Sequence, residues 1–289
     1  MHSEVGAPEL GDVRLDVRSE QARYPILAVR DLVRHFGGVK AVSGCSFEIR
    51  AGTISALIGP NGAGKTTAVN LIAGALTPQG GTVLFEGHDV TGKRPHEVAS
   101  RGLIRTFQIS REYPAMTVLE NLMVSPQRQS GESLFNVLFR RGRYRGEERA
   151  HLERAVGVLD DFGLYEKRDD YAGSLSGGQK RLLELARAVM ADPKLLLLDE
   201  PMAGINPSLM DKVAEHIQRL RDLGVTFLLV EHNLEVVERI CDHVVVMALG
   251  ATLATGTMAE LRNDEAVVSA YLTGGVSDAG AERYESEGL

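Results

Sequence analysis

The stretch with the clearest chemistry is a phosphate-binding loop in the first quarter of the chain. Its residues follow the pattern G-x-x-x-x-G-K-[ST] and are Gly59, Pro60, Asn61, Gly62, Ala63, Gly64, Lys65 and Thr66. Glycines let the backbone fold tightly around an anion, so that successive N–H groups point at phosphate oxygens. The Lys65 ammonium would add a point charge for the β- and γ-phosphates, and the Thr66 hydroxyl would bind Mg²⁺. The pattern predicts a site for a nucleoside triphosphate.

Such a loop needs a strand before it and a helix after it. Residues 53–58 are apolar and partly β-branched, as in a buried strand, and Val69, Ile72 and Leu76 recur at helical spacing. The loop is therefore expected at a helix N-terminus, where the helix dipole favours phosphate. A glycine-rich turn with an incidental lysine is the alternative, which this context disfavours.

Two carboxylates, Asp199 and Glu200, directly follow the apolar run Leu195 to Leu198. A continuous apolar run is typical of a central parallel strand covered on both faces. At the end of such a strand, Asp199 would hold Mg²⁺ and Glu200 would polarise an attacking water. Paired acids at a strand end also suit a solvated loop, but the phosphate loop in the same chain favours the catalytic interpretation.

A second anion site is predicted at LSGGQ, residues 175–179. Ser176, two glycines and the N-terminus of the following helix can together bind an anion. One nucleotide does not need two such cradles, so we expect each cradle of a chain to serve a different nucleotide across a dimer. A Ser-Gly helix cap with no further role is the alternative.

Composition limits the classes of protein. The 289 residues are 44% hydrophobic and 25% charged, as in a soluble globular protein, and the net charge of −7 argues against broad nucleic-acid binding. No apolar run reaches the roughly 18 residues of a membrane span, and the acidic N-terminus lacks a secretory signal. Cys45 and Cys241 are expected to be buried free thiols. We expect a cytosolic chain that reaches the membrane only through a partner.

Apolar strands alternate with amphipathic helices, which indicates an α/β fold with a mainly parallel sheet. Strands are expected at 25–30, 43–50, 82–85, 225–230 and 243–248, and helices at 182–190 and 207–223. The part from 95 to about 170 is expected to be mainly helical, with a polar surface insertion at 125–150. The arginines 140, 141, 143 and 145 in that insertion suit a solvated linker better than a membrane-facing patch. No internal repeat is found, so one nucleotide-binding unit is expected.

The motifs GPNGAGKTT, LSGGQ and LLLLDEP, in this order, resemble those of ATP-binding cassette (ABC) ATPases over roughly residues 26–273. The resemblance implies a P-loop NTPase domain at 25–273, with a RecA-like parallel sheet, an antiparallel β subdomain and a helical subdomain at about 106–175. The segments 1–24 and 274–289 are expected to be flexible extensions. ATP and Mg²⁺ are the implied ligands, and ATP hydrolysis coupled to transmembrane transport is the implied activity.

The resemblance also implies roles that spacing alone does not give. Gln108 resembles the glutamine that contacts Mg²⁺ or water and senses the transporter. His232 resembles the switch histidine at the γ-phosphate, and Phe36 resembles the aromatic residue that stacks on adenine. The implied catalytic residues are Glu200, His232 and Gln108, and the implied metal-binding residues are Thr66, Asp199 and Gln108. The implied nucleotide contacts are Phe36, the loop from Gly59 through Thr67, and Ser176, Gly177, Gly178 and Gln179 of the cradle.

Further segments are similar to the ATP-binding subunits of branched-chain amino acid importers. They lie at 36–38, 105–108, 116–122, 199–207, 230–233 and 270–272. The chain departs from that group at Gly177, where Tyr is frequent, and at Met202, where a small residue is usual. Asn206 takes a position that is commonly Asp in the wider superfamily. The implied partners are transmembrane permease subunits, a second ABC ATPase subunit and a substrate-binding protein, with the chain peripheral on the cytoplasmic side of the membrane.

Three other functions fit parts of the pattern. The same cassette could serve urea, short amides or lipopolysaccharide export. A soluble mechanochemical ABC ATPase resembles either two fused cassettes or a cassette split by a long coiled coil, neither of which this chain shows. A small-molecule kinase or GTPase would share the phosphate loop but not LSGGQ.

Overall fold

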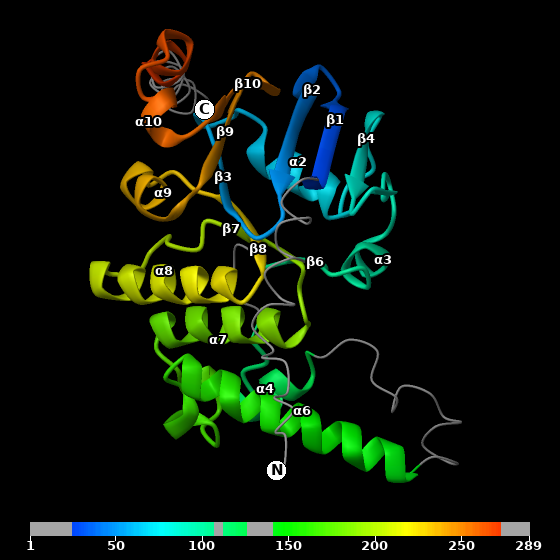
Figure 1. The fold of residues 1–289 in the computed structure, drawn as a ribbon, viewed down its shortest axis with the longest axis vertical. Helices are drawn as coiled ribbons and strands as arrows, with labels where there is room; N and C mark the ends of the chain where they lie inside the picture. The colour runs from blue at the N-terminus through cyan, green and yellow to red at the C-terminus, as the bar shows by residue number, and fades with distance from the viewer. Residues whose placement is uncertain (1–24, 107–111, 126–140, 273–289) are drawn as a thin grey trace, which may run out of the picture.

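Two sheets and the helices around them make up the part of the chain that the computed structural model describes, residues 25–106, 112–125 and 141–272 (Figure 1). The extensions expected to be flexible, 1–24 and 274–289, lie outside these ranges, and so does Gln108. The helices α6, α7 and α8 lie together on one side of the molecule, and the antiparallel sheet lies at the opposite end (Figure 1).

The larger sheet carries the phosphate loop and has the strand order β10-β9-β3-β8-β7-β6. Its strands are β3 (Ile54–Ile58), β6 (Leu103–Arg105), β7 (Leu195–Asp199), β8 (Thr226–Val230), β9 (His243–Ala248) and β10 (Ala251–Gly256). All neighbours pair in parallel except β10, which is antiparallel to β9. Every residue of β3, β7 and β8 is buried, which explains their mainly apolar sequences. The predicted fold class is confirmed.

The two faces of this sheet belong to different cores because successive side chains of a strand point to opposite faces. In β7, Leu195 and Leu197 face α2 (Lys65–Ile72) and the antiparallel sheet. Leu196 and Leu198 face α7 (Gly177–Met190) and α8 (Pro207–Asp222). The strand that ends in the acids is therefore fixed from both sides.

The smaller sheet is antiparallel, in the order β2-β1-β4-β5. Its strands are β1 (Pro25–Phe36), β2 (Val39–Arg50), β4 (Gly80–Phe85) and β5 (His88–Asp89). Two of the predicted strands, 25–30 and 43–50, are in fact twelve residues long. Asp31 has a φ of 47°, its N–H donates to Ser46 Oγ (2.7 Å), and the register shifts there. This bulge breaks the alternation of polar and apolar residues, so the sequence pattern stops at the irregularity although the strand continues.

The region expected to be mainly helical contains α3 (Pro95–Ala99), α4 (Val118–Met123) and α6 (Arg141–Asp161), followed by the 3₁₀ turns η2 (Tyr165–Lys167) and η3 (Ala172–Ser174). Residues 103–105 form the edge strand β6, which was not predicted because it is too short to show a period. Residues 141–150, part of the expected polar insertion, belong to α6, since Arg, Glu and Ala are strong helix formers whatever their polarity. Residues 126–140, the rest of the expected insertion, lie outside the described part.

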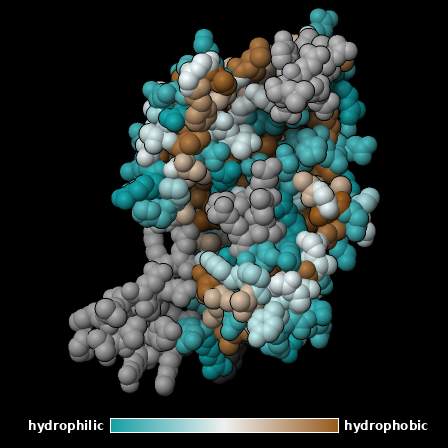
Figure 2. Space-filling view, turned by 180° about the vertical axis from the view of Figure 1, so that it is seen from behind, coloured by the Kyte–Doolittle hydropathy of each residue, from teal (hydrophilic) through white to brown (hydrophobic). Residues whose placement is uncertain are grey.

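Three short helical segments lie at the edge of the larger sheet that β9 and β10 form. They are α9 (Leu234–Ile240), α10 (Met258–Leu261) and the helical residues 265–272. Both cysteines are free thiols, as expected, but only Cys45 is fully buried and Cys241 is half-buried. Within the described residues no helix is long and apolar enough to cross a bilayer. On the face drawn in Figure 2, hydrophobic residues form separate small patches among hydrophilic ones.

The helix α8 carries the buried stripe Val213, Ile217 and Leu220 that its spacing predicted. Beside this stripe, the His216 ring stacks on Phe162 with the ring centroids 4.4 Å apart. Burial lowers the pKa of His216 below its usual 6.5, and nearby charges modify the shift. Those charges are on Arg219, Glu215, Asp161 and Lys212.

Because the pKa of His216 is depressed in the fold, its neutral form stabilises the protein above pH 6.5, and this stability is lost as the pH falls below that value. We expect the fall in melting temperature between pH 7.5 and pH 5.5 to be smaller in His216→Phe, which keeps a stacked ring and cannot titrate. His243, whose pKa is also lowered, accounts for part of the remaining fall. His96→Phe, at an exposed position, is the control, and an unchanged pH dependence in His216→Phe would contradict the assignment.

Candidate nucleotide site

The phosphate loop joins β3 to α2, as the sequence predicted, and its glycines have conformations that other residues rarely adopt. Gly59, Gly62 and Gly64 have φ values of 148°, 75° and 96°. A Cβ on Gly59 would lie 2.1 Å from the Met247 carbonyl oxygen, and one on Gly64 would lie 2.2 Å from that of Ala41. Neighbouring backbone therefore packs directly against the loop and fixes its shape.

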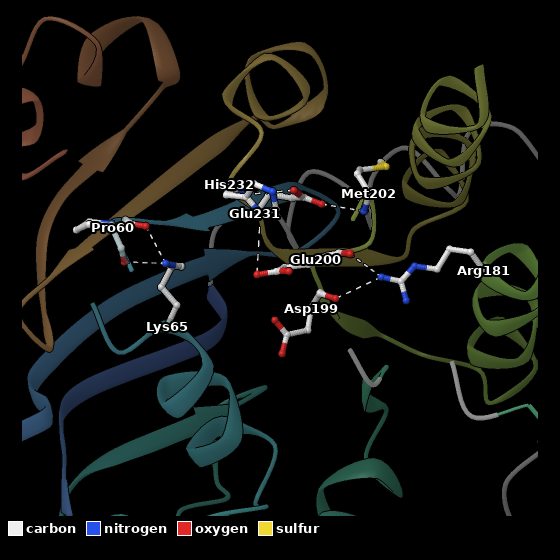
Figure 3. A network of polar contacts seen from close by, with 9 residues as sticks. Pro60, Lys65, Arg181, Asp199, Glu200, Met202, Glu231 and His232 are labelled. Carbon is white, nitrogen blue, oxygen red and sulfur yellow. Dashed lines mark hydrogen bonds and ion pairs between the residues drawn. The ribbon is translucent and has the colours of Figure 1, made fainter. Parts of the chain in front are cut away.

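Lys65 points back into the loop that precedes it (Figure 3). Its Nζ donates to the carbonyl oxygens of Gly59 (2.7 Å) and Pro60 (2.9 Å). Burial lowers the pKa of Lys65, while the negative charges of Glu200 and Asp199 raise it. The side chain thus places a cation between the loop and the acids, where the β- and γ-phosphates are expected.

Phe36, the predicted adenine contact, is the last residue of β1 and is 43% exposed. The Arg34 guanidinium lies 4.9 Å from the centre of its ring. An exposed ring at this position has surface available for a base, and stacking on the planar adenine would bury it. The adenine role of Phe36 remains a prediction.

The two acids end β7, and they differ sharply in exposure. The Asp199 side chain is 2% exposed, whereas that of Glu200 is 33% exposed. Glu200 has a φ of 48°, a conformation that costs a non-glycine residue about 1–3 kcal/mol. The Nδ1 atom of His232 lies 4.0 Å from Glu200 Oε1, so the structure brings the predicted base and the predicted switch histidine together. A partly open carboxylate beside a histidine suits activation of a water.

The residues proposed for Mg²⁺ fit that ion. Mg²⁺ is held in proteins by one or two oxygen ligands, with water and substrate phosphates completing its coordination. Thr66 is the second residue of α2, directly after Lys65, and is exposed, and its hydroxyl has no hydrogen-bond partner among the described residues. Asp199 supplies a carboxylate at the strand end. Gln108, the third predicted ligand, lies outside the described part of the chain.

Arg181 of α7 is a residue that sequence reasoning missed. It is buried, its Nε donates to the carbonyl oxygen of Pro201 (3.0 Å), and its NH2 donates to those of Glu200 (2.6 Å) and Asp199 (3.4 Å). Figure 3 shows it reaching the backbone of the acids from the side opposite Lys65. Its NH1 pairs with Glu184 at 2.6 Å. We infer that Arg181 holds the strained turn that aims the Glu200 side chain.

Replacing Arg181 with Met should therefore lower ATP turnover at least about tenfold, since a misplaced catalytic group alone can cost that much. ATP binding should stay within a few-fold of the parent, because the partners of Arg181 among the described residues are the carbonyl groups of Asp199, Glu200 and Pro201 and the Glu184 side chain, none of them in the phosphate loop. Steady-state turnover and equilibrium binding of a fluorescent ATP analogue measure the two effects. Glu184→Gln is the matched control, since it keeps the three bonds to carbonyls. Equal losses in the two variants would show that the ion pair matters and not the turn.

Glu231 and Tyr271 lie beside the site, next to the histidine loop and the phosphate loop. The buried Glu231 accepts hydrogen bonds from the N–H groups of Met202 (3.0 Å) and His232 (3.3 Å), so it ties the turn after the acids to the histidine loop (Figure 3). Its burial raises its pKa. Burial raises the pKa of Tyr271 to about 12, and the nearby backbone of Gly59 opposes this shift. An acid directly after the apolar run 225–230 was the only sequence signal for Glu231.

The second cradle caps α7. Ser176 Oγ accepts from the Gln179 N–H (3.3 Å), and Gln179 Oε1 accepts from the Ser176 N–H (3.0 Å), which is a capping box. The helix begins at Gly177, five residues earlier than predicted. A Cβ on Gly178 would lie 2.3 Å from Leu209 of α8, so this glycine allows the two helices to approach. The Ser-Gly segment is therefore a helix cap, and it leaves the first N–H groups of α7 available for an anion.

This cradle opens into a hollow of about 1010 Å³. The hollow is lined by residues of the cradle, by 203–206 and the start of α8, and by 160–164 at the end of α6. The phosphate loop is fully described, and none of its residues lines the hollow. The two predicted anion sites of one chain therefore do not share a cavity.

Comparisons with known proteins identify the family. The family model described as ABC transporter matches residues 42–203. The chain is 43% identical over 247 residues to the probable branched-chain amino acid transport ATP-binding protein LivG of Archaeoglobus fulgidus, covering 86% of this chain and 95% of the relative. It is 41% identical to the high-affinity branched-chain amino acid transport ATP-binding protein BraF of Pseudomonas aeruginosa, covering 86% and 98%.

Solved structures show the same architecture. The ADP conformation of MJ1267, an ATP-binding cassette of an ABC transporter, aligns with a TM-score of 0.75 and 39% identity, covering 86% of this chain and 99% of that one. A nucleotide-free cassette aligns with a TM-score of 0.73 and 38% identity, covering 85% and 98%. Sequence motifs, fold and relatives agree, and the chain belongs to the ABC transporter family as an ATP-binding subunit that hydrolyses ATP.

Proposed function

We propose that the chain powers an importer of branched-chain amino acids by clamping ATP between two cassettes. The observation that carries the clamping mechanism is the separation of the two cradles, since the hollow at Ser176–Gln179 contains no residue of the phosphate loop. A second chain that brought its own loop to this cradle would give each nucleotide both anion sites. The proposed substrate rests on the LivG and BraF relatives, whose names specify branched-chain amino acid transport.

In the proposed cycle, the loop from Gly59 to Thr67 holds the phosphates of ATP and Phe36 stacks on adenine. Lys65 exchanges its bonds to the loop carbonyls for bonds to the β- and γ-phosphates. Glu200 orients the attacking water and accepts its proton, while His232 and Gln108 complete the surroundings of the γ-phosphate. Hydrolysis removes the γ-phosphate contacts and so lets the two chains separate.

Bound Mg²⁺ would neutralise charge that develops on the phosphates during transfer. In this chain, Thr66 and Asp199, together with Gln108, would hold the ion. Their oxygens are of the type that Mg²⁺ prefers, and the exposed hydroxyl of Thr66, which bonds to no other described residue, supports the assignment.

The proposed partners are transmembrane permease subunits, a second cassette and, in the complete transporter, a substrate-binding protein. The chain would lie on the cytoplasmic side of the membrane and be attached through the permease. The alternating docking and separation of two cassettes would then drive the permease between its inward- and outward-facing states. We propose no nucleic-acid partner.

Purification of the tagged chain with its membrane partners tests this function. After reconstitution into liposomes with the substrate-binding protein, we expect ATP turnover to rise when leucine, isoleucine or valine is added, and the labelled amino acid to accumulate. Stimulation by urea or short amides alone would support the alternative importers. Recovery of lipopolysaccharide-export proteins as partners would contradict import.

A further inference from the structure

Arg105 lies at the same edge of the sheet as the acids. It is the last residue of β6, and β6 pairs in parallel with β7, with Arg105 opposite Leu197. Parallel strands bring their carboxyl ends to one edge, so the Arg105 side chain and Asp199 meet there. The mechanism above gives Arg105 no role.

The Arg105 guanidinium bridges two elements of the nucleotide site. Its NH2 pairs with Asp199 Oδ2 at 3.0 Å, and the two side chains are only 14% and 2% exposed. Its NH1 donates to Asn70 Oδ1, on α2. Asn70 follows Thr66 by four residues, so both lie on the same face of that helix. One cation therefore connects the metal-binding acid with the helix that carries the other predicted metal ligand.

The charge balance at Asp199 depends on this contact. A buried carboxylate is costly unless an opposite charge compensates it. Among the described residues, Arg105 is the only ion-pair partner of Asp199, since Lys65 acts on it from a distance while bonding the loop carbonyls. Within the described part of the chain the buried Arg105 Nε has no hydrogen-bond partner, so the residues seen there do not satisfy the whole guanidinium.

We propose that Arg105 is a placeholder cation that neutralises and orients Asp199 in the nucleotide-free site and keeps Mg²⁺ from binding there alone. This inference rests on the proposed role of Asp199 as a metal ligand. A fixed guanidinium repels a divalent cation at the same carboxylate, and it occupies one of the two oxygens. A triphosphate adds several negative charges to the site, which offset the repulsion by the guanidinium and allow Mg²⁺ to bind. Mg²⁺ would thus enter with the nucleotide and not before it.

The test is the response of the melting temperature to Mg²⁺ without nucleotide, compared with NaCl at equal ionic strength. A ligand that binds only the folded state stabilises it by RT ln(1 + [L]/Kd), so the rise in melting temperature over a series of Mg²⁺ concentrations gives its affinity. We expect Arg105→Gln to bind Mg²⁺ at least about tenfold more tightly than the parent, because it leaves a buried carboxylate that lacks its close partner. Arg105→Lys keeps the charge and should respond like the parent. If Arg105→Gln does not fold, Arg105→Met replaces it.

Two controls make the result specific. Arg154→Gln removes an arginine from an exposed ion pair with Asp192 (3.2 Å) and should not change the response to Mg²⁺. Adding Asp199→Asn to Arg105→Gln should abolish the gain. An unchanged response in Arg105→Gln, or a gain that persists in the double variant, would overturn the inference. If Asp199→Asn alone kept full Mg-ATP turnover, the metal-binding role of Asp199 itself would be wrong.

Discussion

Replacing Glu200 with Gln should lower ATP turnover by about 10²–10⁴-fold, the range typical for loss of a general base. Glutamine has the shape of glutamate, but its amide cannot accept the proton of the attacking water. The strained turn at Glu200 and its bonds to Arg181 involve only the backbone, so they should survive the change. Steady-state phosphate release by the purified variant measures the effect.

ATP binding should persist in Glu200→Gln, because the phosphate loop and Lys65 are untouched. Equilibrium binding of a fluorescent ATP analogue separates binding from hydrolysis. Glu166→Gln, at an exposed position in η2, removes the same charge away from the site and should keep parental turnover. If Glu200→Gln hydrolysed ATP within twofold of the parent, another group would have to be the base.

Replacing Lys65 with Ala should weaken ATP binding at least about tenfold and abolish measurable turnover, since hydrogen bonds from a charged donor contribute about 1.5–3 kcal/mol each. The ammonium is the cation that the structure places at the centre of the loop, bonded to two carbonyl oxygens. Its loss leaves those carbonyls facing the phosphates without a compensating charge. Binding of ADP should weaken less than that of ATP, because ADP lacks the γ-phosphate.

The matched control for Lys65→Ala is Lys167→Ala. Lys167 is exposed and pairs with Asp170 on the surface, so its loss should leave nucleotide binding unchanged. The same fluorescent analogue serves for both variants, with the melting temperature showing that each is folded. Parental ATP affinity in Lys65→Ala would contradict the assignment of residues 59–67 as the nucleotide loop.

Much of the fold was predictable from the sequence, and the reasons are local. The buried strands β3, β7 and β8 are mainly apolar, because helices or the second sheet cover both of their faces. The loop before α2 follows the pattern G-x-x-x-x-G-K-[ST], which is typical of phosphate-binding loops. The fold class and family were predicted correctly from these features. The roles of individual residues such as Phe36 and His232 remain predictions.

The parts that the sequence did not reveal depend on contacts between distant segments. Arg181 is one charged residue on an amphipathic helix until the fold brings it to the carbonyls that follow β7. Arg105 likewise meets Asp199 only because β6 pairs with β7, and β6 itself is too short to show a period. The continuation of β1 beyond Asp31 and the start of α6 at Arg141 were not predicted, because polar residues interrupt the apolar pattern at both places.

We propose that one chain holds half of each catalytic centre and that ATP joins two chains. Light scattering of Glu200→Gln at saturating Mg-ATP tests it most directly, because this variant should hold ATP without hydrolysing it. We predict that the mass of the 31.3 kDa chain doubles with ATP and returns to that of a single chain when the nucleotide is removed. A particle with a single cassette at saturating Mg-ATP, for the chain alone and for the chain with its co-purified membrane partner, would show that ATP does not join two chains.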